Sequence, residues 1–153
     1  MRGRVILIAV NKIYISDRME KMKKATITAN LNSDVQKVWD IVTDNRDYTW
    51  RNDLSKIEVS DNEQTFIEYT KNGFPTTFTI TLKKPTERYE FDMKNRNMSG
   101  HWVGTFSKTE TGTQIEFTEE LTIKNPIMNL LAGIYIKKQQ ATYVDNLRKA
   151  LGE

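Results

Sequence analysis

Apolar and polar residues alternate with a period of two through most of the chain. A half-buried strand shows this period because successive side chains point to opposite faces of a sheet. Turn-forming pairs such as Asn72-Gly73 separate the alternating segments, so the pattern predicts an antiparallel sheet with one apolar face. The predicted strands are residues 24–31, 54–60, 64–71, 76–84, 86–94, 99–109 and 112–124.

Two short helical segments are predicted between the first and second strands. Ser33 and Gln36 form a capping-box pattern ahead of apolar residues at helical spacing, which predicts a helix over residues 33–44. Residues 45–52 carry two aromatic side chains among polar ones, and we interpret them as a second short helix, with a tight loop as the alternative.

A long helix is predicted after the last strand. Asn125 and Pro126 are typical of a helix start, and the helical pattern continues to about residue 151. Such a helix is about 37 Å long and cannot contact a curved sheet along its whole length, so an internal apolar cavity is expected where they diverge. Its predicted sheet-facing stripe is Ile127, Leu130, Leu131, Ile134, Ala141, Val144, Leu147 and Leu151, with Lys138 as the strongly polar member.

Two segments carry a resemblance to a known family. The stretch SDVQKVWDIVTDNRDYTWRNDLSKIEV at 33–59 resembles the opening of the helix-grip (SRPBCC) superfamily, which includes START lipid-transfer domains, pollen allergens and bacterial polyketide cyclase/dehydrase-like proteins. The stretch at 112–151 is similar to that family's last strand and closing helix. The resemblance implies an α+β helix-grip fold, in which a curved seven-stranded antiparallel sheet wraps around a long C-terminal helix. It also implies a cavity for lipids, polyketides or similar molecules.

The first 22 residues differ from the rest of the chain. Residues 5–10 are a short apolar run after two arginines, too short to span a bilayer or to match an ordinary signal peptide. We interpret residues 1–22 as an extension, either an extra strand, an interaction arm or a translated upstream segment, with Met19 or Met22 as alternative natural starts. Residues 23–153 are predicted to form a single helix-grip domain.

Composition excludes several kinds of site. The chain of 153 residues has no cysteine and one histidine, which excludes thiolate chemistry and any metal site that needs two imidazoles. Metal and cofactor binding are not predicted. The net charge of +3 is spread over lysines interleaved with acids, so nucleic-acid binding and stable membrane insertion are not predicted either. A cytoplasmic monomer or homodimer that binds a small apolar molecule is expected.

Glu119 is the candidate for chemistry. In simple alternation it shares the inner face with Ile115, Phe117 and Leu121, and burial among them would raise its pKa and suit it to act as an acid or base or to orient a ligand hydroxyl. The alternative is a slipped register that places Glu119 in solvent, paired with a lysine.

Other predicted pocket residues are mainly aromatic, and the alternative interpretation places them in an ordinary core. Lys138 is the polar candidate on the helix, and the alternative places its ammonium group in water. His101 and Trp102 point to opposite faces, so His101 is predicted to be solvent-facing or hydrogen-bonded. The predicted ligand-binding set is Trp39, Phe78, Phe91, Trp102, Phe106, Phe117, Glu119, Ile134 and Lys138.

Three functions remain open at this stage. The first is binding of a small hydrophobic ligand in the cavity. The second is a polyketide cyclase/dehydratase-like enzyme that uses Glu119 with the help of Tyr69 or Tyr89. The third is a protein-interaction module in which residues 5–15 add a strand to a partner or to a second copy.

Overall fold

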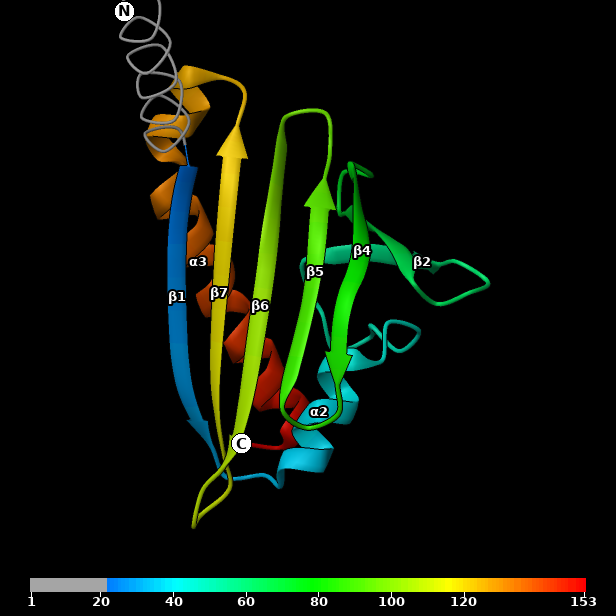
Figure 1. Cartoon of the computed structure of the whole chain (residues 1–153), viewed down its shortest axis with the longest axis vertical. Coiled ribbons are helices and arrows are strands. Elements are labelled where there is room, and N and C mark those ends of the chain that lie inside the picture. The colour runs from blue at the N-terminus through cyan, green and yellow to red at the C-terminus, as the bar shows by residue number, and fades with distance from the viewer. Residues whose placement is uncertain (1–21) are drawn as a thin grey trace, which may run out of the picture.

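Seven antiparallel strands form one sheet in the computed structural model, which describes residues 22–153 (Figure 1). The strand order is β1-β7-β6-β5-β4-β3-β2, so β2 to β7 form the predicted meander and β1 joins it beside β7. The elements are β1 (Met22–Leu31), α2 (Val35–Thr43), β2 (Leu54–Val59), β3 (Thr65–Thr70), β4 (Pro75–Lys84), β5 (Arg88–Lys94), β6 (Met98–Lys108), β7 (Thr113–Ile123) and α3 (Pro126–Leu151).

The predicted boundary between extension and domain lies close to the start of β1. Met22 is the first residue of that strand and pairs with Thr122 of β7, so the sheet begins one residue earlier than the proposed domain. The rest of the proposed extension, residues 1–21, lies outside the described residues.

One short helix, and not two, lies between β1 and β2. In α2, Asp34 takes the N-cap position in place of Ser33, and its Oδ1 accepts a hydrogen bond of 2.8 Å from the Gln36 amide. Residues 45–52 form turns, because the Asp44 carboxylate accepts from the amides of Arg46 and Asp47 at 3.0 and 3.3 Å. The prediction of a second short helix is therefore wrong: side-chain acceptors satisfy these amides without helical backbone bonds.

A bulge interrupts the alternation in β4. Ile80 pairs with Phe91 and Leu82 pairs with Glu90, so β4 advances by two residues where β5 advances by one. A bulge of this kind reverses the parity of the residues that follow it. As a result Leu82 is 40% exposed, whereas simple alternation through the predicted strand 76–84 would place it on the inner face with Ile80.

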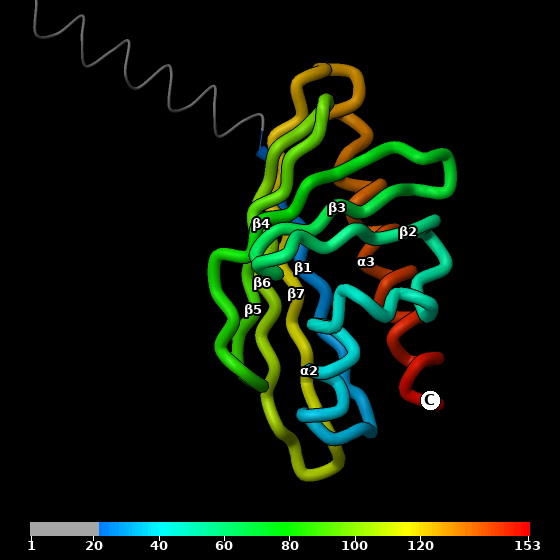
Figure 2. The backbone as a smooth tube through the Cα atoms, turned by 90° about the vertical axis from the view of Figure 1, so that its right-hand side faces the viewer, coloured from blue at the N-terminus to red at the C-terminus, as the bar shows by residue number. Residues whose placement is uncertain are grey.

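The long helix α3 packs mainly on β1 and β7 (Figures 1 and 2). The Asn125 carboxamide caps its start by accepting from the amides of Ile127 and Met128, and Gly152 ends it in the left-handed conformation with φ of 80°. In the second half of the predicted stripe Val144, Leu147 and Leu151 are buried as expected, but Ala141 is exposed. In the first half the buried side chains are instead Ala132, Ile136 and Gln140, and the predicted Ile127, Leu130, Leu131 and Ile134 are exposed.

The sheet curves, so that its β2–β3–β4 end turns toward α3 while α2 lies below (Figure 2). The inner face therefore looks toward both helices. No helix of the described region is long and apolar enough to cross a membrane.

Candidate functional site

A continuous layer of aromatic rings covers the inner face of the sheet. Phe66 stacks on Phe78 at 4.8 Å between ring centroids, and Phe91 stacks on Trp102 at 4.7 Å. Each pair is directly opposite in the strand register, which is why the rings meet. Trp39 of α2 adds an edge contact to Phe106 at 5.1 Å. The predicted aromatic residues Trp39, Phe78, Phe91, Trp102, Phe106 and Phe117 all belong to this one cluster.

Gly104 makes room for the Trp102 indole. Both residues lie on the inner face of β6, two positions apart, and the indole ring lies over the glycine. A Cβ atom at position 104 would lie 2.7 Å from Trp102 Cζ3 and 3.1 Å from Phe117 Cδ1, closer than packed carbon atoms approach each other. The position of the indole at the centre of the wall therefore depends on the missing side chain.

Glu119 lies within this aromatic wall, as its parity predicts. It is 9% exposed and pairs in register with Trp102 on one side and Ala25 on the other. Burial, together with the nearby charge of Glu68, raises the pKa of Glu119 to about 7. Within residues 22–153 its carboxylate has no hydrogen bond or ion pair, and its oxygens are not among the fully enclosed unpaired atoms. This buried carboxyl therefore changes protonation near neutral pH.

Arg51 forms the centre of a second polar group on the same side of the sheet. Its guanidinium donates to both Asp53 oxygens, at 2.9 and 2.7 Å, and to Glu68 at 3.3 Å. The Arg51 and Glu68 side chains are 11% and 18% exposed. Burial raises the pKa of Glu68 and Asp53 adds to the rise, although Arg51 opposes both effects. The charge of Glu68 in turn adds to the raised pKa of Glu119.

Tyr143 of α3 connects the polar group to the aromatic wall. Its ring makes edge contacts with Trp50 at 5.2 Å and Phe117 at 5.8 Å, and the Arg51 guanidinium lies 4.7 Å from its centroid. Burial raises the pKa of the Tyr143 hydroxyl, so it stays a neutral donor at physiological pH. The helix, the loop before β2 and strand β7 therefore meet at this ring.

The two tyrosines proposed to assist Glu119 lie in different places. Tyr89 is buried in the aromatic wall, and its hydroxyl accepts a hydrogen bond of 3.2 Å from the Asn45 amide. Tyr69 donates to Glu58 at 2.9 Å on the outer face. The proposal that Tyr69 assists Glu119 is wrong, because Tyr69 has the opposite parity to Glu68 in β3.

Two predicted ligand-binding residues of α3 face away from the sheet. Ile134 is 74% exposed, and Lys138 is also exposed. These two predictions are wrong because the first half of the helix turns its Ala132, Ile136 and Gln140 side toward β1 and β7. Gln140 holds this orientation by donating to the main-chain carbonyls of Ala25 and Phe117, at 3.0 and 3.4 Å.

His101 lies on the outer face, away from the aromatic wall. Its ring nitrogens contact Asp92 at 2.7 Å and Glu90 at 3.2 Å, in agreement with the expected hydrogen-bonded role. Among residues 22–153, no three acidic or histidine side chains gather closely enough to hold a metal ion.

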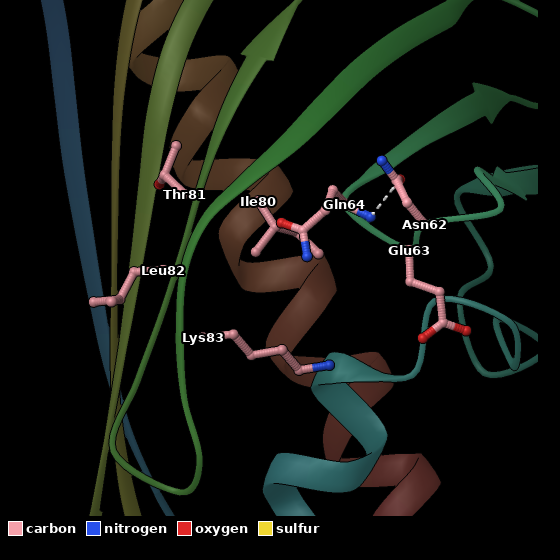
Figure 3. A pocket seen from close by; sticks show the side chains of 7 residues that line it. All are labelled: Asn62, Glu63, Gln64, Ile80, Thr81, Leu82 and Lys83. Atoms are coloured by element: carbon pink, nitrogen blue, oxygen red, sulfur yellow. Dashed lines mark hydrogen bonds between the residues drawn. The ribbon is translucent and has the colours of Figure 1, made fainter.

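Two surface hollows lie where the turn between β2 and β3 approaches β4 and the end of α2. Their volumes are about 280 and 370 Å³, and both are lined by Glu63, Ile80 and Lys83. Figure 3 shows Lys83 pointing from β4 toward α2 and Gln64 hydrogen-bonded to Asn62. Neither hollow is lined by the predicted aromatic residues, so these polar depressions are distinct from the cavity predicted between sheet and helix.

Comparison with protein families supplies the identification. Residues 22–152 match the family model described as polyketide cyclase/dehydrase and lipid transport. The chain belongs to this family. The family relationship confirms the resemblance seen at residues 33–59 and 112–151. A search of curated proteins found no significant match.

Solved structures share the fold of this family member at low sequence identity. A START superfamily protein from Mycobacterium smegmatis has 8% identity and a TM-score of 0.71, with 84% of this chain and 95% of that one covered. A Mesorhizobium loti protein has 15% identity and a TM-score of 0.70, with 85% and 97% covered. A di-domain aromatase/cyclase of the steffimycin biosynthetic pathway has 16% identity and a TM-score of 0.67, with 87% of this chain covering 50% of that one.

The Arg51 group was missed by reasoning from sequence. Glu68 has the parity of Phe66 in a predicted strand, and this parity is the signal in the sequence that places Glu68 on the inner face. Arg51 and Asp53 lie in the loop before β2, and Tyr143 lies beside the predicted helical stripe. No periodicity places a loop residue against a strand and a distant helix, so their meeting could not be predicted.

Proposed function

We propose that the chain binds a small, largely apolar molecule on the inner face of the sheet, with one polar group of the molecule at Glu119. The observation that carries this proposal is the Glu119 carboxyl, which is 9% exposed, lies within an aromatic wall and lacks a hydrogen-bond partner among the described residues. A buried polar group without a partner is costly, and a ligand hydroxyl, carbonyl or amine would satisfy it.

The packing of α3 supports the same location. The helix packs mainly on β1 and β7, which leaves Phe91 of β5 only partly buried although it belongs to the inner face. An apolar molecule lying against the Phe91 ring would remove it from water. The family description includes lipid transport, which is consistent with an apolar ligand.

Displacement of a neutral apolar dye, Nile red, tests the proposal. Naphthalene and 2-naphthol serve as matched competitors with and without a hydroxyl group. Glu119→Leu is expected to weaken 2-naphthol binding by about tenfold, the loss of one hydrogen bond to a polar group, and to leave naphthalene binding nearly unchanged. Ile134→Asp is the control, because it removes an exposed apolar side chain that could bind dye elsewhere. Equal effects of Glu119→Leu on both competitors would contradict the role of Glu119.

The second candidate is a cyclase/dehydratase-like enzyme. Its supporting observation is the pKa of about 7 at Glu119, which suits a carboxyl that accepts and returns a proton near neutral pH. If the chain is such an enzyme, turnover of a linear poly-β-ketone should change across about pH 7 and be abolished in Glu119→Gln. Binding of the same compound without turnover between about pH 6 and 8 would leave only the binding function.

A further inference from the structure

Helix α3 carries a second apolar face that the sheet does not cover. In its first half Ala132, Ile136 and Gln140 are buried, while Leu130 and Ile134 are 82% and 74% exposed. At about 100° per residue, the exposed side chains lie on nearly the opposite side of the helix from the buried ones. We call this surface the outer stripe. It consists of Ile127, Leu130, Leu131 and Ile134, with Met128 and Tyr135 at its edges, all exposed.

The outer stripe has the spacing of a buried helix surface. Positions 127, 130, 131 and 134 follow the i, i+3, i+4, i+7 pattern by which an amphipathic helix contacts a neighbouring element. Single exposed apolar residues are ordinary, but a contiguous group of large ones marks an interaction surface.

The chain enters the described fold at the end of the sheet where this helix begins. Met22 pairs with Thr122 near the end of β7, and α3 begins at Pro126. The start of β1 and the start of α3 therefore lie at the same end of the sheet (Figure 1). The preceding apolar residues, 5–10 and 13–15, are joined to Met22 by a linker of six residues, 16–21, which can reach up to about 20 Å.

We infer that residues 5–15 of the chain bind the outer stripe of their own molecule. Both apolar partners are present in every copy, at the millimolar effective concentration that a short linker provides. Residues 5–10 contain no charge, and the whole segment 5–15 contains one charged residue, Lys12. A second copy is less suited, because Lys124, Lys137 and Lys138 lie near the stripe and would meet the same charges in an identical stripe.

Hydrogen exchange of the full-length protein, read by mass spectrometry, tests this inference. The variant Leu130→Asp/Ile134→Asp places two charges on the stripe at exposed positions and leaves the core intact. Amides of residues 5–15 are expected to exchange at least about tenfold faster in this variant than in the wild type. Lys149→Asp, exposed near the C-terminal end of the same helix and far from the stripe, is the control and should leave their exchange unchanged.

Cysteine crosslinking in the full-length chain distinguishes the possible occupants. The natural sequence has no cysteine, so Ile8→Cys with Leu130→Cys gives a single engineered pair. An intramolecular disulfide in the monomer is expected. The yield of this disulfide should be at least about tenfold higher than that of the pair Ile8→Cys with Lys149→Cys. Position 149 lies about 28 Å further along the helix than position 130. A disulfide-linked dimer would overturn the inference. The inference would also be overturned if the amides of residues 5–15 exchanged without protection and the chain sedimented with phosphatidylcholine/phosphatidylglycerol vesicles.

Discussion

Replacing Glu119 by glutamine should stabilise the fold at high pH and have little effect at low pH. The folded-state pKa of about 7 lies above the ordinary value of 4.5, mainly because of burial and secondly because of Glu68. Between these two values the folded chain binds more protons than the unfolded chain, so stability falls as pH rises. Above about pH 7 the ionised carboxylate costs the folded state about 3 kcal/mol, and below about pH 4.5 this cost is absent.

Urea unfolding followed by tryptophan fluorescence at a series of pH values measures this effect. The difference in unfolding free energy between Glu119→Gln and wild type should grow from near zero at about pH 4.5 to about 3 kcal/mol at about pH 8.5. Glu116→Gln, at an exposed position of the same strand, is the control and should show no such growth. A Glu119→Gln difference that is constant with pH would refute the assignment of a buried, unpaired carboxyl.

Three further substitutions test other parts of the site. Arg51→Met leaves Glu68 buried without its cation, so it should lower the unfolding free energy by about 3–5 kcal/mol in urea titrations. Adding Glu68→Leu should recover most of that loss, because no carboxylate is then left without a partner. Gly104→Ala displaces the Trp102 indole and should cost about 1–3 kcal/mol together with a shift in tryptophan emission; unchanged emission would contradict the close packing. His101→Ala on the outer face should leave Nile red affinity within about twofold of wild type, and a larger loss would place ligand on that face.

Strand periodicity accounts for most of what could be predicted about the fold and the aromatic wall. A strand has only two faces, so the parity of Glu119, Phe117 and Trp102 placed them together before any contact was known. The bulge in β4 is the exception. It reverses the parity at Leu82, and no pattern in the local sequence indicates an extra residue in the strand.

The helix was less predictable, because a helix has a full circumference and α3 is apolar on two sides in its first half. Which side meets the sheet depends on contacts with β1 and β7, including the bonds from Gln140 to the carbonyls of Ala25 and Phe117. In the first half of α3 the sequence alone selected the wrong stripe, and with it Ile134 and Lys138, whereas Val144, Leu147 and Leu151 of the second half are buried as predicted.

The sequence by itself therefore determined the order of the elements, the apolar face of the sheet and the inward position of Glu119, because these follow from local periodicity. Only the tertiary structure decided which face of α3 is buried and that Arg51, Glu68 and Tyr143 lie together. These features arise where a loop, a strand and a distant helix meet, and their energies depend on burial and on charges that are far apart along the chain.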